Sequence, residues 1–95
     1  MKYKLIITEE AALEISDAFK YYESQLPGLG SKFLSHLEIY LKRIQLYPEH
    51  YQIKRQPYRE AFIKKFPYLI IYEFTEGQVV VYAVFNTYRN PSQKP

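Results

Sequence analysis

The strongest hydrophobic signal in the chain is a pair of apolar runs near its C-terminal end. They span Phe66–Phe74 and Gln78–Phe85, and both are rich in the β-branched and aromatic residues that favour strands. Gly77 lies between them at the tip of a short turn, so the pattern predicts an antiparallel hairpin. Neither run alternates between apolar and polar residues, so we expect both faces of these strands to be at least partly covered.

Two helices are predicted before this hairpin. Thr8 is a good N-cap residue, and after it apolar residues recur at helical spacing as far as Leu26. The segment Leu26–Gly30 breaks that pattern, and a second helix with its own apolar stripe is predicted from about Ser31 to Tyr47. Because the connection is so short, the two helices should form an antiparallel hairpin.

Three further segments are predicted to be extended. Lys2–Ile7 is a short strand, Tyr51–Arg55 is either a short strand or an extended loop, and Arg59–Phe66 is a strand. The expected fold is α+β, in the order β-α-α-β-β-β, with the helical hairpin packed on one face of a curved antiparallel sheet. No linker or repeat interrupts residues 1–95, which we expect to form a single domain. The core is expected to include Phe66, Tyr72 and Val81.

The composition excludes several kinds of site. The chain has no cysteine, which rules out disulfides and thiolate metal sites and fits a reducing cytoplasm. Its two histidines, His36 and His50, lack a third partner, so no metal site and no cofactor are predicted. No targeting segment or membrane span is expected. The net charge of +3 permits a polyanionic partner without demanding one.

Two groups of residues could carry function. Between Lys54 and Lys65 lie five basic residues and one acidic residue, which form either a phosphate-binding strip or an edge strand protected from aggregation. Lys64 fits the edge-strand interpretation better, and Arg59 fits both equally. The second group is the pair Tyr88 and Arg89 beyond the last strand, which could grip a phosphate and a base or anchor a protein partner.

Common catalytic motifs are absent. The glycines between the helices do not follow a strand, as a phosphate-cradling loop would, and no serine nucleophile motif is present. The remaining enzymatic possibility is metal-independent RNA cleavage. That reaction needs a base for the 2′-hydroxyl, cations around the phosphorane and an acid for the leaving oxygen.

The order and spacing of several segments resemble the RelE/ParE superfamily of toxins from bacterial type II toxin–antitoxin pairs. The resemblance covers nearly the whole chain. It is carried by Tyr21–Glu23 with Leu26–Gly30 and Phe33, by Phe66–Tyr72, and by Val79–Phe85 followed by Arg89–Pro91. It implies a helical hairpin against a curved sheet, and an antitoxin wrapped around the toxin.

The superfamily divides by target. RelE-like members cut mRNA on the ribosome, whereas ParE-like members poison DNA gyrase. The positions at which cleaving members carry cations correspond here to Glu60, Phe62 and Leu69, and a frequent family histidine corresponds to Asn86. Only Arg89 matches a basic catalytic position, so the chain resembles the ParE-like branch more closely.

We therefore expect a cytoplasmic toxin that inhibits gyrase and is neutralised by a tightly bound antitoxin. The alternatives are a ribosome-dependent mRNA endoribonuclease and a degenerate, non-toxic binding module. Exposed aromatic surface on a small protein usually indicates a partner, and Tyr3, Tyr51 and Tyr58 are candidates for such a surface. If the protein were a nuclease, Arg89 and Arg59 would be catalytic. The expected target- or partner-binding residues are Tyr88, Arg89, Asn90, Arg59 and Lys64.

Overall fold

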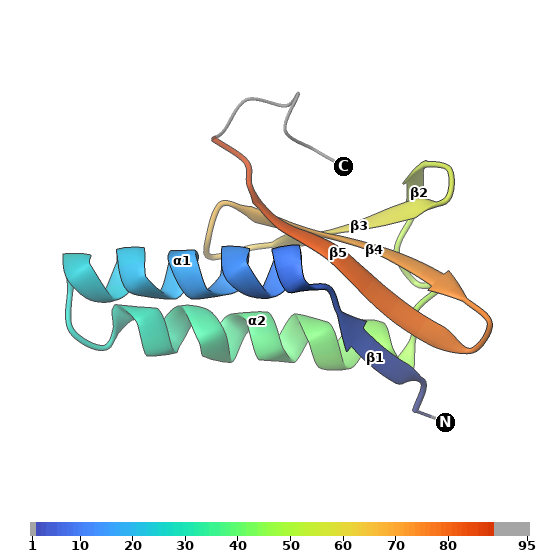
Figure 1. Cartoon of the computed structure of the whole chain (residues 1–95), viewed down its shortest axis with the longest axis horizontal. Helices are drawn as coiled ribbons and strands as arrows, with labels where there is room; N and C mark the ends of the chain where they lie inside the picture. The colour runs from blue at the N-terminus through green and yellow to red at the C-terminus, as the bar shows by residue number, and fades with distance from the viewer. Residues whose placement is uncertain (1, 89–95) are drawn as a thin grey trace.

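A computed structural model describes residues 2–88, in which two helices pack on one face of a five-stranded sheet (Figure 1). The α+β class and the helical hairpin are as the sequence predicts. Tyr51–Arg55 contributes a short strand, so four strands rather than three follow the helices. The elements are β1 (Lys4–Ile7), α1 (Glu9–Gln25), α2 (Leu29–Leu46), β2 (Ile53–Arg55), β3 (Tyr58–Ile63), β4 (Tyr68–Thr75) and β5 (Gln78–Asn86).

The helical hairpin follows from capping and from the two apolar stripes. The Thr8 hydroxyl oxygen accepts a hydrogen bond from the Ala11 N–H at 3.2 Å and so caps α1. Leu26, the last residue of the expected stripe, instead ends the helix and is 59% exposed. Gly28 then takes a left-handed conformation, with φ of 90°, that reverses the chain into α2.

The strand order is β1-β5-β4-β3-β2. β2 to β5 are antiparallel neighbours, but β1 runs parallel to β5, so the sheet is mixed. A tight hairpin would force antiparallel pairing, whereas β1 and β5 are joined through all the intervening elements and are free to run parallel. β1 pairs only with the first half of β5, and the second half of the same edge of β5 lies against α1. There Glu14 Oε1 accepts a hydrogen bond from the Val84 N–H at 2.9 Å.

The β4–β5 turn has the chemistry that a two-residue hairpin loop requires. Glu76 and Gly77 both have positive φ, 51° and 74°, which is typical of a type I′ turn. The register between the strands shifts once, between Ile71 and Tyr72. This irregularity adds one residue to β5 and increases its local twist.

The core lies between the helices and the inner face of the sheet. Phe66, Tyr72 and Val81 are at most 8% exposed, which confirms their predicted burial. They pack with the buried stripe of α2, which includes Phe33 and Ile44. The continuous cluster explains why two amphipathic helices and one sheet face can form a stable unit in so short a chain.

A second, smaller cluster lies on the outer face of the sheet, opposite the helices. Its buried members are Ile71, Ala83 and Phe85. The prediction that both faces of the hairpin are partly covered is therefore confirmed. Tyr3, Tyr51 and Tyr58, expected to be exposed, are instead half-buried against neighbouring side chains.

Candidate functional site

The end of β5 is held by a short network of hydrogen bonds. The Asn86 amide nitrogen donates to the Tyr68 hydroxyl at 3.4 Å, and its carbonyl oxygen accepts from the Tyr88 N–H at 2.9 Å. The Thr87 N–H donates to the Pro67 carbonyl oxygen at 2.7 Å. These bonds fix the backbone up to Tyr88, whose side chain is 87% exposed. The predicted binding tyrosine is thus presented to solvent from a fixed position.

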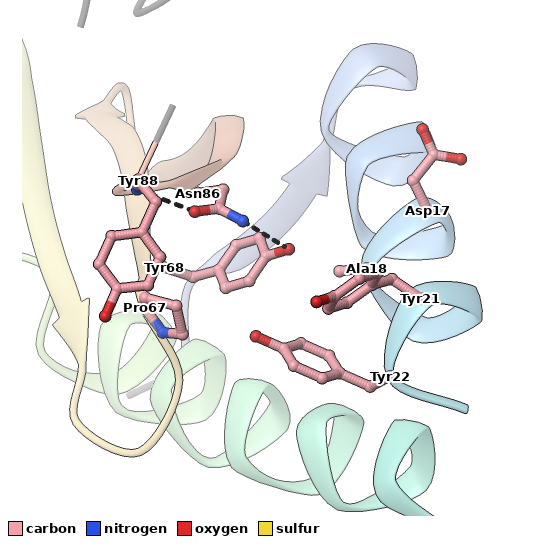
Figure 2. A pocket seen from close by; sticks show the side chains of 8 residues that line it. All are labelled: Asp17, Ala18, Tyr21, Tyr22, Pro67, Tyr68, Asn86 and Tyr88. Carbon is pink, nitrogen blue, oxygen red and sulfur yellow. Dashed lines mark hydrogen bonds between the residues drawn. The ribbon is translucent and has the colours of Figure 1, made fainter. Parts of the chain in front are cut away.

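A groove of about 560 Å³ lies between this end of the sheet and α1 (Figure 2). Asp17 and Ala18 lie one helical turn before Tyr21 and Tyr22, so the four residues are neighbours on one side of α1. In Figure 2, Tyr22 and Tyr68 point toward one another across the groove. We call this site the tyrosine groove, and its lining residues are Asp17, Ala18, Tyr21, Tyr22, Pro67, Tyr68, Asn86 and Tyr88.

The tyrosine groove is aromatic and acidic. The rings of Tyr21 and Tyr22 meet edge to face at 5.2 Å, and those of Tyr22 and Tyr68 at 6.3 Å. Burial raises the pKa of the Tyr22 hydroxyl, and nearby Tyr68, Tyr21 and Tyr88 raise it further. No lysine or arginine is among the described residues that line the groove.

The other predicted site residues do not all gather here. The strand register places Tyr68 between Ile63 and Asn86, so Lys64, which follows Ile63, lies at the Tyr88 end of the sheet and is exposed. Arg59 pairs with Tyr72 instead, four residues or about 13 Å further along β4. Arg89 and Asn90 lie outside the described residues.

Arg59 makes a structural contact. Its guanidinium Nη1 donates to the Tyr51 carbonyl oxygen at 2.6 Å, and the side chain is half-buried. Tyr51 in turn packs edge-on against Tyr72, with 6.5 Å between the ring centroids. Arg59 thus ties the loop before β2 to the sheet.

The outer face of the sheet forms a second candidate surface. Phe62 lies opposite Leu69, and Glu60 lies opposite Ile71, so these side chains are neighbours on this face. Glu60, Phe62 and Leu69 are the positions that the resemblance to RelE-like toxins aligned with cations. Phe62 is 53% exposed. The Glu73 carboxylate lies on the same face, where it accepts a hydrogen bond from the Tyr82 hydroxyl at 2.9 Å. We call this surface the outer-face patch, and it comprises Tyr58, Glu60, Phe62, Leu69, Ile71, Glu73, Tyr82, Ala83 and Phe85.

Residues 5–91 match the family described as ParE toxin of type II toxin-antitoxin system, parDE. The chain belongs to this family. The toxin also shares its fold with a solved chain described as "Chromosomal ParDE TA system from P. aeruginosa", with a TM-score of 0.79 and 12% identity over 90% of this chain and 96% of that one. No curated protein matches the toxin. Within residues 2–88, neither helix has the length and apolarity needed to cross a membrane.

The tyrosine groove was not predicted from the sequence. Tyr88 was a candidate, but Asp17, Tyr21 and Tyr22 were not among the candidate functional residues. The helical spacing of Asp17, Tyr21 and Tyr22 could have indicated a shared face, since residues four apart are neighbours on a helix. The sequence pattern could not predict that Tyr68 and Asn86 lie near that face, because their position depends on how the sheet packs on α1.

Proposed function

We propose that this ParE-family toxin inhibits DNA gyrase in the cytoplasm and is neutralised by a cognate antitoxin, and that it does not cleave mRNA. The membership of a toxin–antitoxin family supports a dedicated antitoxin partner. The choice between gyrase and ribosome-bound mRNA as the target depends on whether the toxin has cationic side chains placed to stabilise a reacting phosphate.

The observation that carries the proposal is the chemistry of the outer-face patch. Phosphoryl cleavage builds negative charge, and each preorganised donor supplies roughly 3–4 kcal/mol of transition-state stabilisation. At the corresponding positions this toxin has a carboxylate, Glu60, and two apolar side chains, Phe62 and Leu69. Glu73 adds a second carboxylate to the same face. At these three positions the surface therefore offers a phosphate no cation, and its exposed Phe62 suits a protein.

Arg59 supports the same conclusion. A catalytic arginine must direct its guanidinium at the reacting phosphate, whereas Arg59 donates to a backbone carbonyl oxygen in its own protein. Turning it toward RNA would break that hydrogen bond, which is partly buried and charge-assisted. Arg89 then remains a candidate catalytic cation, and Arg59 of β3 is not available to act beside it.

We further propose that the target is bound at the Tyr88 end of the sheet. Tyr88 is well placed as an anchor because it is exposed and its backbone is held by Asn86. Lys64 lies at the same end, and Arg89 and Asn90 directly follow Tyr88 in the sequence. Arg59, the remaining predicted contact residue, would reach this target only from the other end of β3.

The decisive experiment is to induce the toxin in growing cells, with and without the product of the neighbouring reading frame. We expect growth arrest with loss of plasmid negative supercoiling, relieved by the neighbour, and no new cleavage sites by primer extension on mRNA. Purified gyrase should lose supercoiling activity when the purified toxin is added.

Two outcomes would contradict the proposal. Cleavage in the ribosomal A-site codon within minutes of induction, absent from an Arg89→Ala strain, would establish the endoribonuclease alternative. Growth unaffected by an expressed and folded toxin would establish the degenerate binding module.

A further inference from the structure

Asn86, the last residue of β5, uses both ends of its side-chain amide (Figure 2). Its oxygen accepts a hydrogen bond from the Tyr88 N–H at 2.9 Å, and its nitrogen donates to the Tyr68 hydroxyl oxygen at 3.4 Å. A backbone N–H can only donate, so the amide oxygen must face Tyr88 and the nitrogen is left to face Tyr68. An Asn side chain that accepts from the N–H two residues later forms a turn and sets the direction of the backbone that follows.

The Tyr68 hydroxyl is a fixed point for this amide. Tyr68 is directly opposite Asn86 in the pairing of β4 with β5 and is only 4% exposed. Its ring packs against those of Phe33 and Tyr22, with centroids 5.2 and 6.3 Å away. A side chain held by the core on this scale keeps one orientation, and so does the hydroxyl that it carries.

Tyr88 depends on its backbone for a fixed position. Its side chain is 87% exposed, so packing contributes little to holding it. The residue before it is tied to the loop ahead of β4, because the Thr87 N–H and Oγ1 both donate to the Pro67 carbonyl oxygen, at 2.7 and 3.1 Å. The hydrogen bond to Asn86 then extends this order by one residue, to Tyr88 itself.

We propose that Asn86 is a positioning residue for target binding: it holds Tyr88 in place before the target arrives, and the buried Tyr68 hydroxyl keeps the Asn86 amide in the orientation that this requires. The inference rests on the proposed function, since it takes Tyr88 as the anchor of the target. A residue that is already ordered loses less entropy on binding. For one immobilised side chain this difference corresponds to about threefold to tenfold in affinity.

The first test measures the order of Tyr88 directly, without the target. The purified toxin is labelled with ¹⁵N, and the heteronuclear NOE of the Tyr88 amide is recorded. We expect a value close to that of β5 in the parent and a clear fall in Asn86→Ala. Asn86→Ser should restore much of the order, because a serine hydroxyl also accepts from the N–H two residues later, although more weakly. Tyr68→Phe should lower the value less than Asn86→Ala does.

Thr87→Val is the matched control for this measurement. It removes a neighbouring hydroxyl but keeps the backbone N–H bond to Pro67, so the Tyr88 amide should behave as in the parent. A parental NOE in Asn86→Ala would overturn the proposal. A parental NOE in Tyr68→Phe, with a reduced one in Asn86→Ala, would overturn the role given to Tyr68.

The second test measures inhibition of purified gyrase, with each variant shown to be folded by circular dichroism. The toxin concentration that halves supercoiling should rise about threefold to tenfold in Asn86→Ala, rise less in Tyr68→Phe, and return toward the parental value in Asn86→Ser. Tyr72→Phe is the control, because it also removes a buried β4 hydroxyl, one that donates to the Pro48 carbonyl oxygen. It should stay within about twofold of the parent.

The outcomes separate this inference from the proposed function. Weak inhibition by Tyr88→Ala together with parental inhibition by Asn86→Ala would overturn the inference alone. Equal inhibition by Tyr88→Ala and the parent, or no inhibition by the parent, would instead contradict the proposed function. In that case the NOE measurements still decide whether Asn86 positions Tyr88.

Discussion

The carboxylate of Glu23 on α1 accepts a hydrogen bond from the backbone N–H of Gly30 in α2 at 3.0 Å. Its second oxygen accepts from the Gly28 N–H at 2.9 Å. Gly28, the N-cap of α2, has no side chain that could cap the helix. One helix therefore caps the other, and the negative carboxylate lies at the positive end of the α2 dipole. This contact joins Glu23 to the Leu26–Gly30 segment that connects the two helices.

Removing this cap should destabilise the toxin measurably. We expect Glu23→Ala to lower the free energy of unfolding by about 1–2 kcal/mol, because two N–H groups at the helix start lose their acceptor. Glu23→Gln retains one acceptor oxygen and should lose less. Urea denaturation followed by circular dichroism measures both. Glu38→Gln removes a carboxylate from a 71% exposed site on α2 and serves as the control, which should remain within about 0.5 kcal/mol of the parent. Parent-like stability of Glu23→Ala would show that water replaces the carboxylate without cost.

Gly30 is required because the helices approach closely there. A Cβ at this position would lie 2.7 Å from the Phe19 carbonyl oxygen and 2.8 Å from Glu23 Oε1. We expect Gly30→Ala to destabilise by about 1–3 kcal/mol, since backbone cannot yield as a side chain can. Ser31→Ala, one residue later and exposed, is the matched control and should be close to neutral. A Gly30→Ala variant more stable than the parent, as helix propensity alone predicts, would contradict the close approach.

Tyr72 supplies a buried hydrogen bond that a single substitution removes. Its hydroxyl donates to the Pro48 carbonyl oxygen at 2.6 Å, and the side chain is fully buried. Tyr72→Phe should therefore cost about 1–3 kcal/mol at neutral pH, because the carbonyl oxygen loses its donor.

The pH dependence has a definite sign. Burial raises the pKa of Tyr72 well above the ordinary value of 10.0, more than nearby Arg59 lowers it. Above pH 10 the unfolded chain loses this proton while the folded toxin keeps it, so stability falls as pH rises. The fall measured between neutral pH and pH 11 should be shallower in Tyr72→Phe. Parallel curves for parent and variant would show that Tyr72 ionises normally when folded.

Phe66 should be a major contributor to the core. Its ring meets those of Tyr22, Phe33 and His36 with centroids 5.0, 5.3 and 5.5 Å away. Phe66→Ala should cost about 3–5 kcal/mol, a large fraction of the total stability of a small domain. Phe62→Ala removes the same side chain from a 53% exposed position and serves as the control. Similar melting temperatures for the two variants would contradict the burial of Phe66.

These residues also show how far the sequence could predict the molecule. Helix caps, apolar stripes and tight turns depend on residues that are close together in the sequence. The sequence pattern therefore predicted the Thr8 cap, the helical hairpin and the two strands around Gly77. The parallel pairing of β1 with β5 did not, because it joins Lys4 to Gln78 across nearly the whole chain. The tyrosine groove could not be predicted for the same reason, since it also depends on contacts between distant parts of the sequence. The sequence predicted Tyr88, but the groove requires α1 and β5 to meet, and Arg59 appeared suitable for binding until its contact with Tyr51 was visible.

The last prediction separates target binding from folding at Tyr88. The side chain is 87% exposed, and the hydrogen bond to Asn86 comes from its backbone, which alanine retains. We therefore expect Tyr88→Ala to change the free energy of unfolding by no more than about 0.5 kcal/mol. Toxicity should nevertheless fall, since the variant removes the aromatic anchor proposed for the target. The measurement is the concentration of inducer that halves the growth rate, with toxin levels checked by immunoblot.

Tyr47→Ala provides the control, because Tyr47 is also a surface tyrosine, 64% exposed, but follows α2 and does not line the tyrosine groove. It should keep parental toxicity. If Tyr88→Ala stayed as toxic as Tyr47→Ala at equal protein level, the Tyr88 end of the sheet would not be the target-binding surface. The outer-face patch, with its exposed Phe62, would then become the surface to test, and Phe62→Ala should abolish the inhibition of purified gyrase.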